Sequence, residues 1–183
     1  MTNNEIKWYN QYIKDIDINK ISWIILTDDE LQTFYKENYF DKENNSYVYT
    51  TNLDKQNPFG LFYLTFDSLA GLKYLLGVVP NNINKLTIIA ALAFNDNYYL
   101  YSDQQEPITY ISTVETNKYF RNQGIFKQLV LKAIEYNPSY QNILFSDESD
   151  MGKLCHVEEI ATKLLQSSKY PKDARSDTKN FND

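Results

Sequence analysis

Residues 108–132 read I-T-Y-I-S-T-V-E-T-N-K-Y-F-R-N-Q-G-I-F-K-Q-L-V-L-K, and this stretch decides the fold. Its first part, Ile108–Thr116, is rich in β-branched side chains, which is typical of a β-strand. After Gly124 the apolar residues recur at helical spacing; they are Ile125, Phe126, Leu129, Val130, Ala133 and Ile134. The hydrophobic period therefore changes from that of a strand to that of a helix across a glycine, and residues 137–138 (Asn-Pro) end the helix.

The junction between this strand and this helix is basic, although the chain is acidic. Residues 116–132 contain no acidic residue and carry four basic ones, which are Lys118, Arg121, Lys127 and Lys132. The whole chain has 18 Lys and Arg against 24 Asp and Glu, a net charge of −6. A helix N-terminus offers free N–H groups and partial positive charge, and a glycine there lets a ligand approach the backbone. These features predict a phosphate or pyrophosphate site; the alternative is an ordinary strand–helix turn with a solvated basic face.

The residues at this junction resemble a known motif. Residues 121–126, Arg-Asn-Gln-Gly-Ile-Phe, resemble the R/Q-x-x-G-x-G/A signature of the GNAT (GCN5-related N-acetyltransferase) superfamily. The resemblance covers residues 86–168. It implies that Arg121, Asn122, Gln123, Gly124, Ile125 and Phe126 bind the pyrophosphate of acetyl-CoA. It also implies that the main chain around Val114 and Thr116 binds the pantetheine arm.

Two features depart from that family pattern. Phe126 stands where Gly or Ala is commoner, so its side chain is expected to point away from the phosphates into the helix packing. The family usually ends with two more strands, whereas here only the polar residues 171–183 follow the last expected helix. We expect one domain over residues 1–170 and a polar, flexible tail over 171–183.

The N-terminal half contains weaker signals. Residues 6–18 can form a helix or a loose arm, and residues 21–26 form a strand-length run. Thr27 and Glu30 have the spacing of a capping box that begins a helix to about residue 40. Residues 41–58 read as a long polar loop that contains a short strand at 47–51.

The remaining segments lead into the motif. Patterns of apolar residues predict a strand at 61–66, a helix at 67–76, a strand at 86–94 with a turn at 95–97, and a return strand at 98–101. A further strand at 143–145 and a helix at 151–167 follow the motif. The expected fold is α/β (α+β): a GNAT-like mixed, mostly antiparallel central sheet flanked by helices, with a β-α-β crossover at the acyl-CoA site.

The resemblance also suggests catalytic groups. The backbone N–H of Val114 matches the family's oxyanion donor. The family's N-x-x-A-x-x-x-Y spacing places His156 where a Tyr usually protonates the thiolate, and an imidazolium can do so near neutral pH. Glu115 is a candidate base, directly or through a water, while Asp147 and Glu148 are alternatives. A purely structural role remains open for His156 and for Glu115, and Cys155 reads as a small buried apolar residue.

Composition excludes several classes of site. The chain has one Cys and one His, so it cannot form an internal disulfide or a zinc site of the Cys/His kind, and no metal site is expected. The apolar run 88–94 is too short to cross a bilayer, and residues 1–10 carry no signal-peptide core. We therefore expect a soluble cytoplasmic protein that binds neither a membrane nor, given its acidity, nucleic acid.

The function implied by the resemblance is acyl-CoA-dependent N-acetylation. Acetyl would move from acetyl-CoA to an amine of a small molecule or a protein lysine by direct attack, without a covalent enzyme intermediate. The resemblance also allows a homodimer. The alternative is a GNAT-fold binding or interaction module without catalytic turnover.

Overall fold

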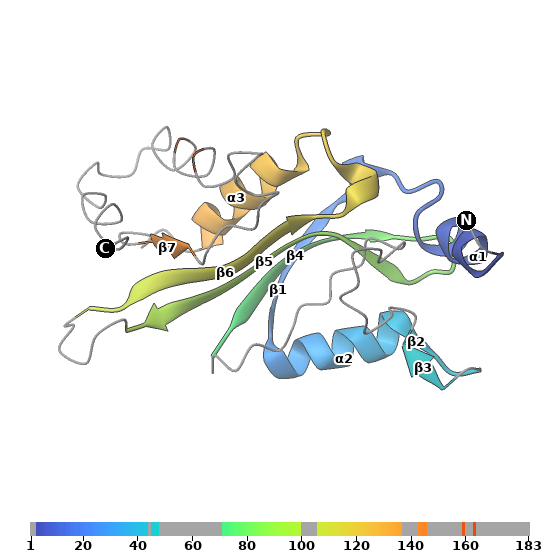
Figure 1. The fold of residues 1–183 in the computed structure, drawn as a ribbon, viewed down its shortest axis with the longest axis horizontal. Helices are drawn as coiled ribbons and strands as arrows, with labels where there is room; N and C mark the ends of the chain where they lie inside the picture. The colour runs from blue at the N-terminus through green and yellow to red at the C-terminus, as the bar shows by residue number, and fades with distance from the viewer. Residues whose placement is uncertain are drawn as a thin grey trace.

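A five-stranded sheet in the order β1-β4-β5-β6-β7 forms the centre of the structure (Figure 1). The structure is a computed structural model that describes residues 3–43, 45–47, 71–99, 106–136, 143–145, 159 and 163. The strands of this sheet are β1 (Ser22–Thr27), β4 (Lys73–Pro80), β5 (Leu86–Tyr98), β6 (Ile108–Thr116) and β7 (Ile143–Phe145). Strands β1, β4, β5 and β6 pair antiparallel, and β7 pairs parallel to β6. A small separate sheet joins β2 (Phe40–Asp41) and β3 (Ser46–Tyr47).

Helices lie on both sides of the central sheet. The helices are α1 (Asn3–Tyr12), α2 (Asp28–Tyr39) and α3 (Ile125–Tyr136), and the 3-10 turns are η1 (Ile18–Lys20) and η2 (Lys118–Phe120). Figure 1 shows α3 against one face of the sheet and α2 below the other. The path from β6 through α3 to β7 is a crossover between parallel strands. The predicted fold, a mostly antiparallel mixed sheet flanked by helices with a β-α-β crossover, is confirmed.

The start of α2 follows from the predicted capping box. The backbone N–H and the hydroxyl of Thr27 both donate to Glu30 Oε2, at 2.8 and 2.9 Å. These two hydrogen bonds lower the pKa of the Glu30 carboxyl. The apolar stripe that continues from this cap is buried against the sheet; its members are Leu31, Phe34, Tyr35 and Tyr39.

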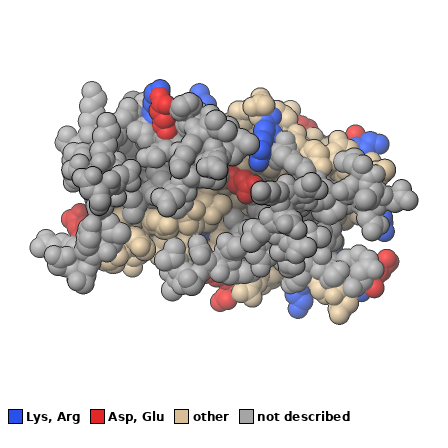
Figure 2. Space-filling view, viewed as in Figure 1, with Lys and Arg blue, Asp and Glu red and all other residues tan. Residues whose placement is uncertain are grey.

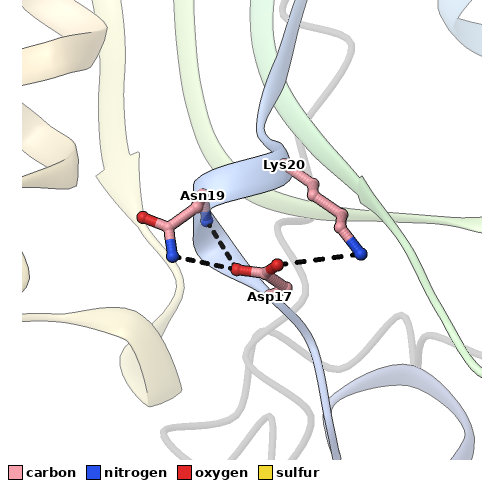
Figure 3. A network of polar contacts seen from close by, with 3 residues as sticks. All are labelled: Asp17, Asn19 and Lys20. Carbon is pink, nitrogen blue, oxygen red and sulfur yellow. Dashed lines mark hydrogen bonds and ion pairs between the residues drawn. The ribbon is translucent and has the colours of Figure 1, made fainter.

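A short turn brings the chain into β1. The Asp17 carboxylate accepts hydrogen bonds from the backbone N–H and the side-chain amide of Asn19, both at 3.0 Å (Figure 3). Lys20 Nζ lies 3.7 Å from the other carboxylate oxygen. The hydrogen bonds from Asn19, and secondarily the charge of Lys20, lower the pKa of Asp17. Asp17 thus caps η1 and directs the chain toward the edge strand.

The first segment forms a docked helix rather than a loose arm. Tyr12 and Ile13 are buried in the main core. The Thr87 hydroxyl donates to the carbonyl oxygen of Tyr12 at 2.8 Å, and the Tyr12 ring stacks on Tyr39 with centroids 5.7 Å apart. These contacts attach the end of α1 to β5 and α2.

The helix predicted at residues 67–76 is wrong over residues 73–76, because Lys73–Pro80 forms strand β4. Leu75 and Leu76 point to opposite faces of a sheet that is covered on both sides, so both are fully buried. A continuous apolar run fits a buried central strand as well as a helix, and pairing with β1 and β5 decides between them. Residues 67–70, the strand predicted at 61–66 and residues 48–58 lie outside the described residues.

The turn predicted at residues 95–97 is also wrong, because β5 continues to Tyr98. The polar residues form an irregularity within the strand, where the register to β6 shifts between Asn95 and Tyr98. Asn97 N–H donates to Asn95 Oδ1 at 2.8 Å, and Lys73 Nζ pairs with Asp96 Oδ2 at 2.6 Å. Of the expected return strand, Tyr98 belongs to β5, and residues 100–101 lie outside the described residues. None of the described helices has the length and apolar character needed to span a bilayer.

Candidate functional site

The parallel strands β6 and β7 are paired over part of β6 only. Residues Ile143–Phe145 of β7 lie opposite Thr109, Tyr110 and Ile111. Within the part of the chain that is described, residues 113–116 of β6 have no strand partner on that side. Among the described residues, the end of β6 therefore borders a gap in the sheet.

The backbone of β6 presents hydrogen-bonding groups to this gap. The N–H of Asn117, just past the strand, donates to the carbonyl oxygen of Ile89 on β5 at 2.8 Å. Because antiparallel partners alternate, the backbone groups of Val114 and Thr116 point away from β5. The carbonyl of Thr116 indeed faces that side, since it accepts a hydrogen bond from Arg121 Nε at 3.0 Å. The N–H and C=O of Val114 thus face the gap, in the position of a strand partner.

The loop between β6 and α3 exposes backbone N–H groups. Asn122 and Gly124 both adopt positive φ, 63° and 74°. Gly124 O accepts the first hydrogen bond of α3, from Gln128 N–H at 3.2 Å. The N–H groups of residues 125–127 consequently have no partner within the helix, and residues 121–124 are exposed. The positive φ of Gly124 favours glycine at this position. No atom lies within 4 Å of the place that a Cβ would occupy, so the space above Gly124 is open.

The first turn of α3 is anchored by Ile125. Ile125, Leu129 and Ala133 are buried in the core, while Phe126 is half-buried and is not among the core residues. Phe126 therefore enters the helix packing only in part, and Ile125 is the side chain that fixes the turn.

The basic residues of the motif do not all gather at the loop. Arg121 and Lys127 are exposed close to it. Lys132 lies further along α3, where its Nζ pairs with Glu135 Oε2 at 2.5 Å. On the face drawn in Figure 2, basic and acidic side chains of the described residues are interspersed. The positively charged groups exposed close to the loop are thus Arg121 and Lys127, beside the N–H groups of the first turn of α3.

Glu115 lies on β6 between Val114 and Thr116, so its side chain points to the opposite face of the sheet from theirs. Burial raises the pKa of its carboxyl from 4.5 to about 7, and the Arg121 guanidinium lowers it in part. Solvent still reaches part of the Glu115 side chain. A carboxyl in this range can accept a proton near neutral pH.

The hydroxyl of Thr116 is the one buried side-chain polar atom in the described part of the chain that has no hydrogen-bond partner. A buried hydroxyl without a partner costs free energy unless a ligand or a water satisfies it. Thr116 Oγ1 therefore adds a polar side-chain atom to the end of β6 next to the Arg121 contact.

Several sequence-predicted residues cannot be placed. His156, Cys155, Asp147 and Glu148 lie outside the described residues. Glu159 and Lys163 are helical and form an ion pair four residues apart, in agreement with the helix predicted at 151–167. The described structure brings together all the predicted cofactor-binding residues, from Val114 to Phe126, at one end of the sheet.

Sequence reasoning missed Asn117, which is fully buried at the start of the loop. Its side chain caps η2 by accepting a hydrogen bond from Tyr119 N–H at 3.1 Å. The available signal was an Asn directly after a strand, since Asn favours the first position of a turn or helix.

The mixed sheet, with a parallel pair beside a glycine loop and a helix N-terminus, has the α+β arrangement predicted from the sequence. No family model and no curated protein matches the sequence. Similar solved structures include an aminoglycoside acetyltransferase from an uncultured soil metagenomic sample in complex with sisomicin, at 15% identity, covering 79% of this chain and 88% of that one with a TM-score of 0.45. A transcriptional regulator from Bacillus halodurans C-125 is 18% identical over 76% and 91%, with a TM-score of 0.42. AtaTR bound with AcCoA is 12% identical over 80% and 83%, with a TM-score of 0.43. At TM-scores below 0.5, the fold class rests on the strand order and pairing of this chain itself.

Proposed function

We propose that this protein is an acyl-CoA-dependent N-acetyltransferase that uses acetyl-CoA as the acyl donor. The observation that carries the proposal is the combination, among the described residues, of a gap beside Val114 and an exposed loop at residues 121–124 that leads into a helix start whose first N–H groups have no partner within the helix. A pantetheine arm can pair with the free backbone of β6 as a strand would, while a pyrophosphate meets the helix N-terminus.

The reaction requires few chemical groups. An acceptor amine attacks the thioester carbonyl carbon, a C–N bond forms, the C–S bond breaks, and the thiolate leaves. The proposed roles are oxyanion stabilisation by Val114 N–H, removal of the amine proton by Glu115, and protonation of the thiolate by His156. The acceptor is a small-molecule amine or a protein lysine.

A second candidate function is acyl-CoA or partner binding without turnover. It is favoured by the position of Glu115, whose side chain lies on the opposite face of β6 from that of Val114, and by Ser112 and Thr113, which supply no carboxylate to the strand. The two functions share the cofactor site and differ in thiol release.

Thermal unfolding with and without about millimolar acetyl-CoA tests the proposal. A ligand at about 100 times its Kd stabilises the native state by roughly 2.7 kcal/mol, which raises the unfolding midpoint clearly. We expect this rise in the wild type and in Lys36→Glu, an exposed site on α2 with the same change of charge, and its loss in Arg121→Glu. No rise in the wild type would overturn the proposal.

Thiol release with a panel of small amines and lysine peptides separates the two functions. An acetyltransferase releases free CoA in proportion to acetylated amine. A binding module gives the thermal shift but no thiol above the rate of spontaneous hydrolysis with every acceptor.

A further inference from the structure

A bulge in β5 lies directly beside the beginning of the candidate phosphate loop. In the pairing of β4 with β5, Gly77 lies opposite Ala90 and Val78 opposite Ile88, so Ile89 is an extra residue on β5. A bulge leaves backbone groups without their ladder partners. Here these groups are satisfied from other elements: Ile88 N–H donates to the Tyr39 hydroxyl at 2.7 Å, and Ile89 O accepts from Asn117 N–H.

Asn117 joins this bulge to the turn η2 through the nitrogen and the oxygen of its side-chain amide. Its Nδ2 donates to Ile88 O at 3.4 Å, and its Oδ1 accepts from Tyr119 N–H at 3.1 Å. Its own carbonyl accepts from Phe120 N–H at 2.9 Å. One fully buried residue thus supplies two contacts to the bulge and two to the turn η2.

We propose that Asn117 is a positioning residue, which holds the turn η2 on the β5 bulge and thereby sets the conformation of the phosphate loop 121–124. This inference rests on the proposed function, because it assigns the way in which that acyl-CoA site is held ready for its ligand. The turn η2 leads directly into Arg121, whose guanidinium returns to Thr116 O.

The amide chemistry explains why the position holds Asn. Only a short side chain with a donor and an acceptor can contact Ile88 O and Tyr119 N–H together. Ser can accept from Tyr119 N–H as an N-cap but cannot reach both groups, and Ala can do neither. The Oδ1 contact orders the loop, and the Nδ2 contact orients the amide.

Asn81 provides a matched control at the same end of β5, in the β4–β5 connection. It is buried as well, its Nδ2 donates to Thr87 Oγ1 at 3.1 Å, and its Oδ1 accepts from Ile83 and Lys85 N–H at 3.1 and 3.0 Å. Asn81 orders the β4–β5 connection, and its side-chain hydrogen bonds go to Thr87, Ile83 and Lys85 rather than to residues 117–124. A substitution there removes equivalent hydrogen bonds without touching the phosphate loop.

The test compares wild type, Asn117→Ala, Asn117→Ser and Asn81→Ala at a temperature well below every unfolding midpoint. CoA affinity is measured by titration calorimetry, and amide hydrogen exchange is followed in peptides that cover residues 117–124. We expect Asn117→Ala to bind CoA about tenfold more weakly and to exchange faster in this segment, which corresponds to the loss of one cap. Asn117→Ser should recover most of the affinity. Asn81→Ala should unfold at a lower temperature but keep wild-type affinity and loop exchange.

The outcomes separate the two claims. If Asn117→Ala keeps wild-type CoA affinity and loop exchange and is only less stable, like Asn81→Ala, the positioning role is overturned. If the wild type itself does not bind CoA, the proposed function fails, and hydrogen exchange still decides whether Asn117 orders the loop. If Asn117→Ala does not fold, Asn117→Gln replaces it in the comparison. This variant displaces the same amide by one methylene and should also bind CoA more weakly.

Discussion

Arg121 Nε donates a hydrogen bond to the carbonyl oxygen of Thr116 at 3.0 Å, so the loop after β6 folds back on the end of its own strand. The contact uses one N–H of the guanidinium and leaves the other donors of the fork for a ligand. It also places a positive charge beside Glu115, whose pKa it lowers against the effect of burial. The same arginine therefore shapes the loop and tunes the candidate base.

Gly124→Ala is expected to lower the free energy of unfolding by roughly 1 kcal/mol, because a side chain at φ 74° is strained although nothing crowds it. CoA binding should fall as well, since the methyl group occupies the open space above the loop. Gly71→Ala, at φ 83°, is the matched control. It should cost comparable stability and leave CoA affinity unchanged; equal affinities for both variants would contradict a ligand at Gly124.

Glu115→Gln should change how stability depends on pH. The folded-state pKa of Glu115 is raised from 4.5 toward about 7, so between these values the native state holds more protons than the unfolded state. Stability from this group therefore falls as pH rises through that window and is constant above it. As pH rises from 4.5 to about 7, the stability of the variant should increase relative to that of the wild type. The increase should be small, because the Glu115 side chain reaches solvent. Denaturant unfolding at several pH values tests this, and parallel curves would contradict it.

Glu115→Gln also tests the base. If Glu115 removes the amine proton, kcat/KM of the wild type rises with pH up to the pKa of this carboxyl and then levels off. The variant should lose most of the rate while largely keeping CoA affinity, because Gln has the size of Glu and the side chain points to the opposite face of the sheet from those of Val114 and Thr116. An unchanged pH–rate profile would assign the proton transfer to another group.

Thr116→Val should be neutral or slightly stabilising without ligand, because the buried hydroxyl that it removes has no partner among the described residues. If the hydroxyl meets the acyl donor, CoA affinity falls severalfold at the same time. Thermal unfolding and calorimetric titration of one sample measure both effects. A loss of stability without ligand would show that the hydroxyl has a partner within the protein.

Tyr39→Phe removes the acceptor of Ile88 N–H at the β5 bulge. A buried N–H left without a partner costs about 1–3 kcal/mol, so the unfolding midpoint should fall clearly. Tyr136→Phe removes an exposed, longer contact of 3.4 Å to Trp23 O and should change stability by less than about 0.5 kcal/mol. Equal effects of the two substitutions would contradict the role of Tyr39 in the bulge.

Local sequence patterns predicted those elements whose conformation depends on neighbouring residues. The capping box of Thr27 and Glu30, the strand Ile108–Thr116 and the helix that begins at Ile125 agree with the sequence reading. The loop around Gly124 was predictable for the same reason, because a glycine between a strand period and a helix period has a strictly local cause. His156 lies outside the described residues, and its role stays a prediction.

Elements that depend on distant partners were decided only by tertiary structure. Leu75 and Leu76 suit a helix or a buried strand equally, and pairing with β1 and β5 makes them a strand. Residues 95–97 have the composition of a turn, yet pairing of Asn95 and Tyr98 with β6 keeps the segment within β5. Asn117 gains its link to β5 from the bulge at Ile88 and Ile89, which is remote in sequence. By itself the sequence determined the start of α2, the strand β6 and the start of α3, since these depend on neighbouring residues. Only the assembled sheet decided which backbone groups face the gap and which side chain holds the loop, because hydrogen-bond partners far apart in the chain compete for the same groups.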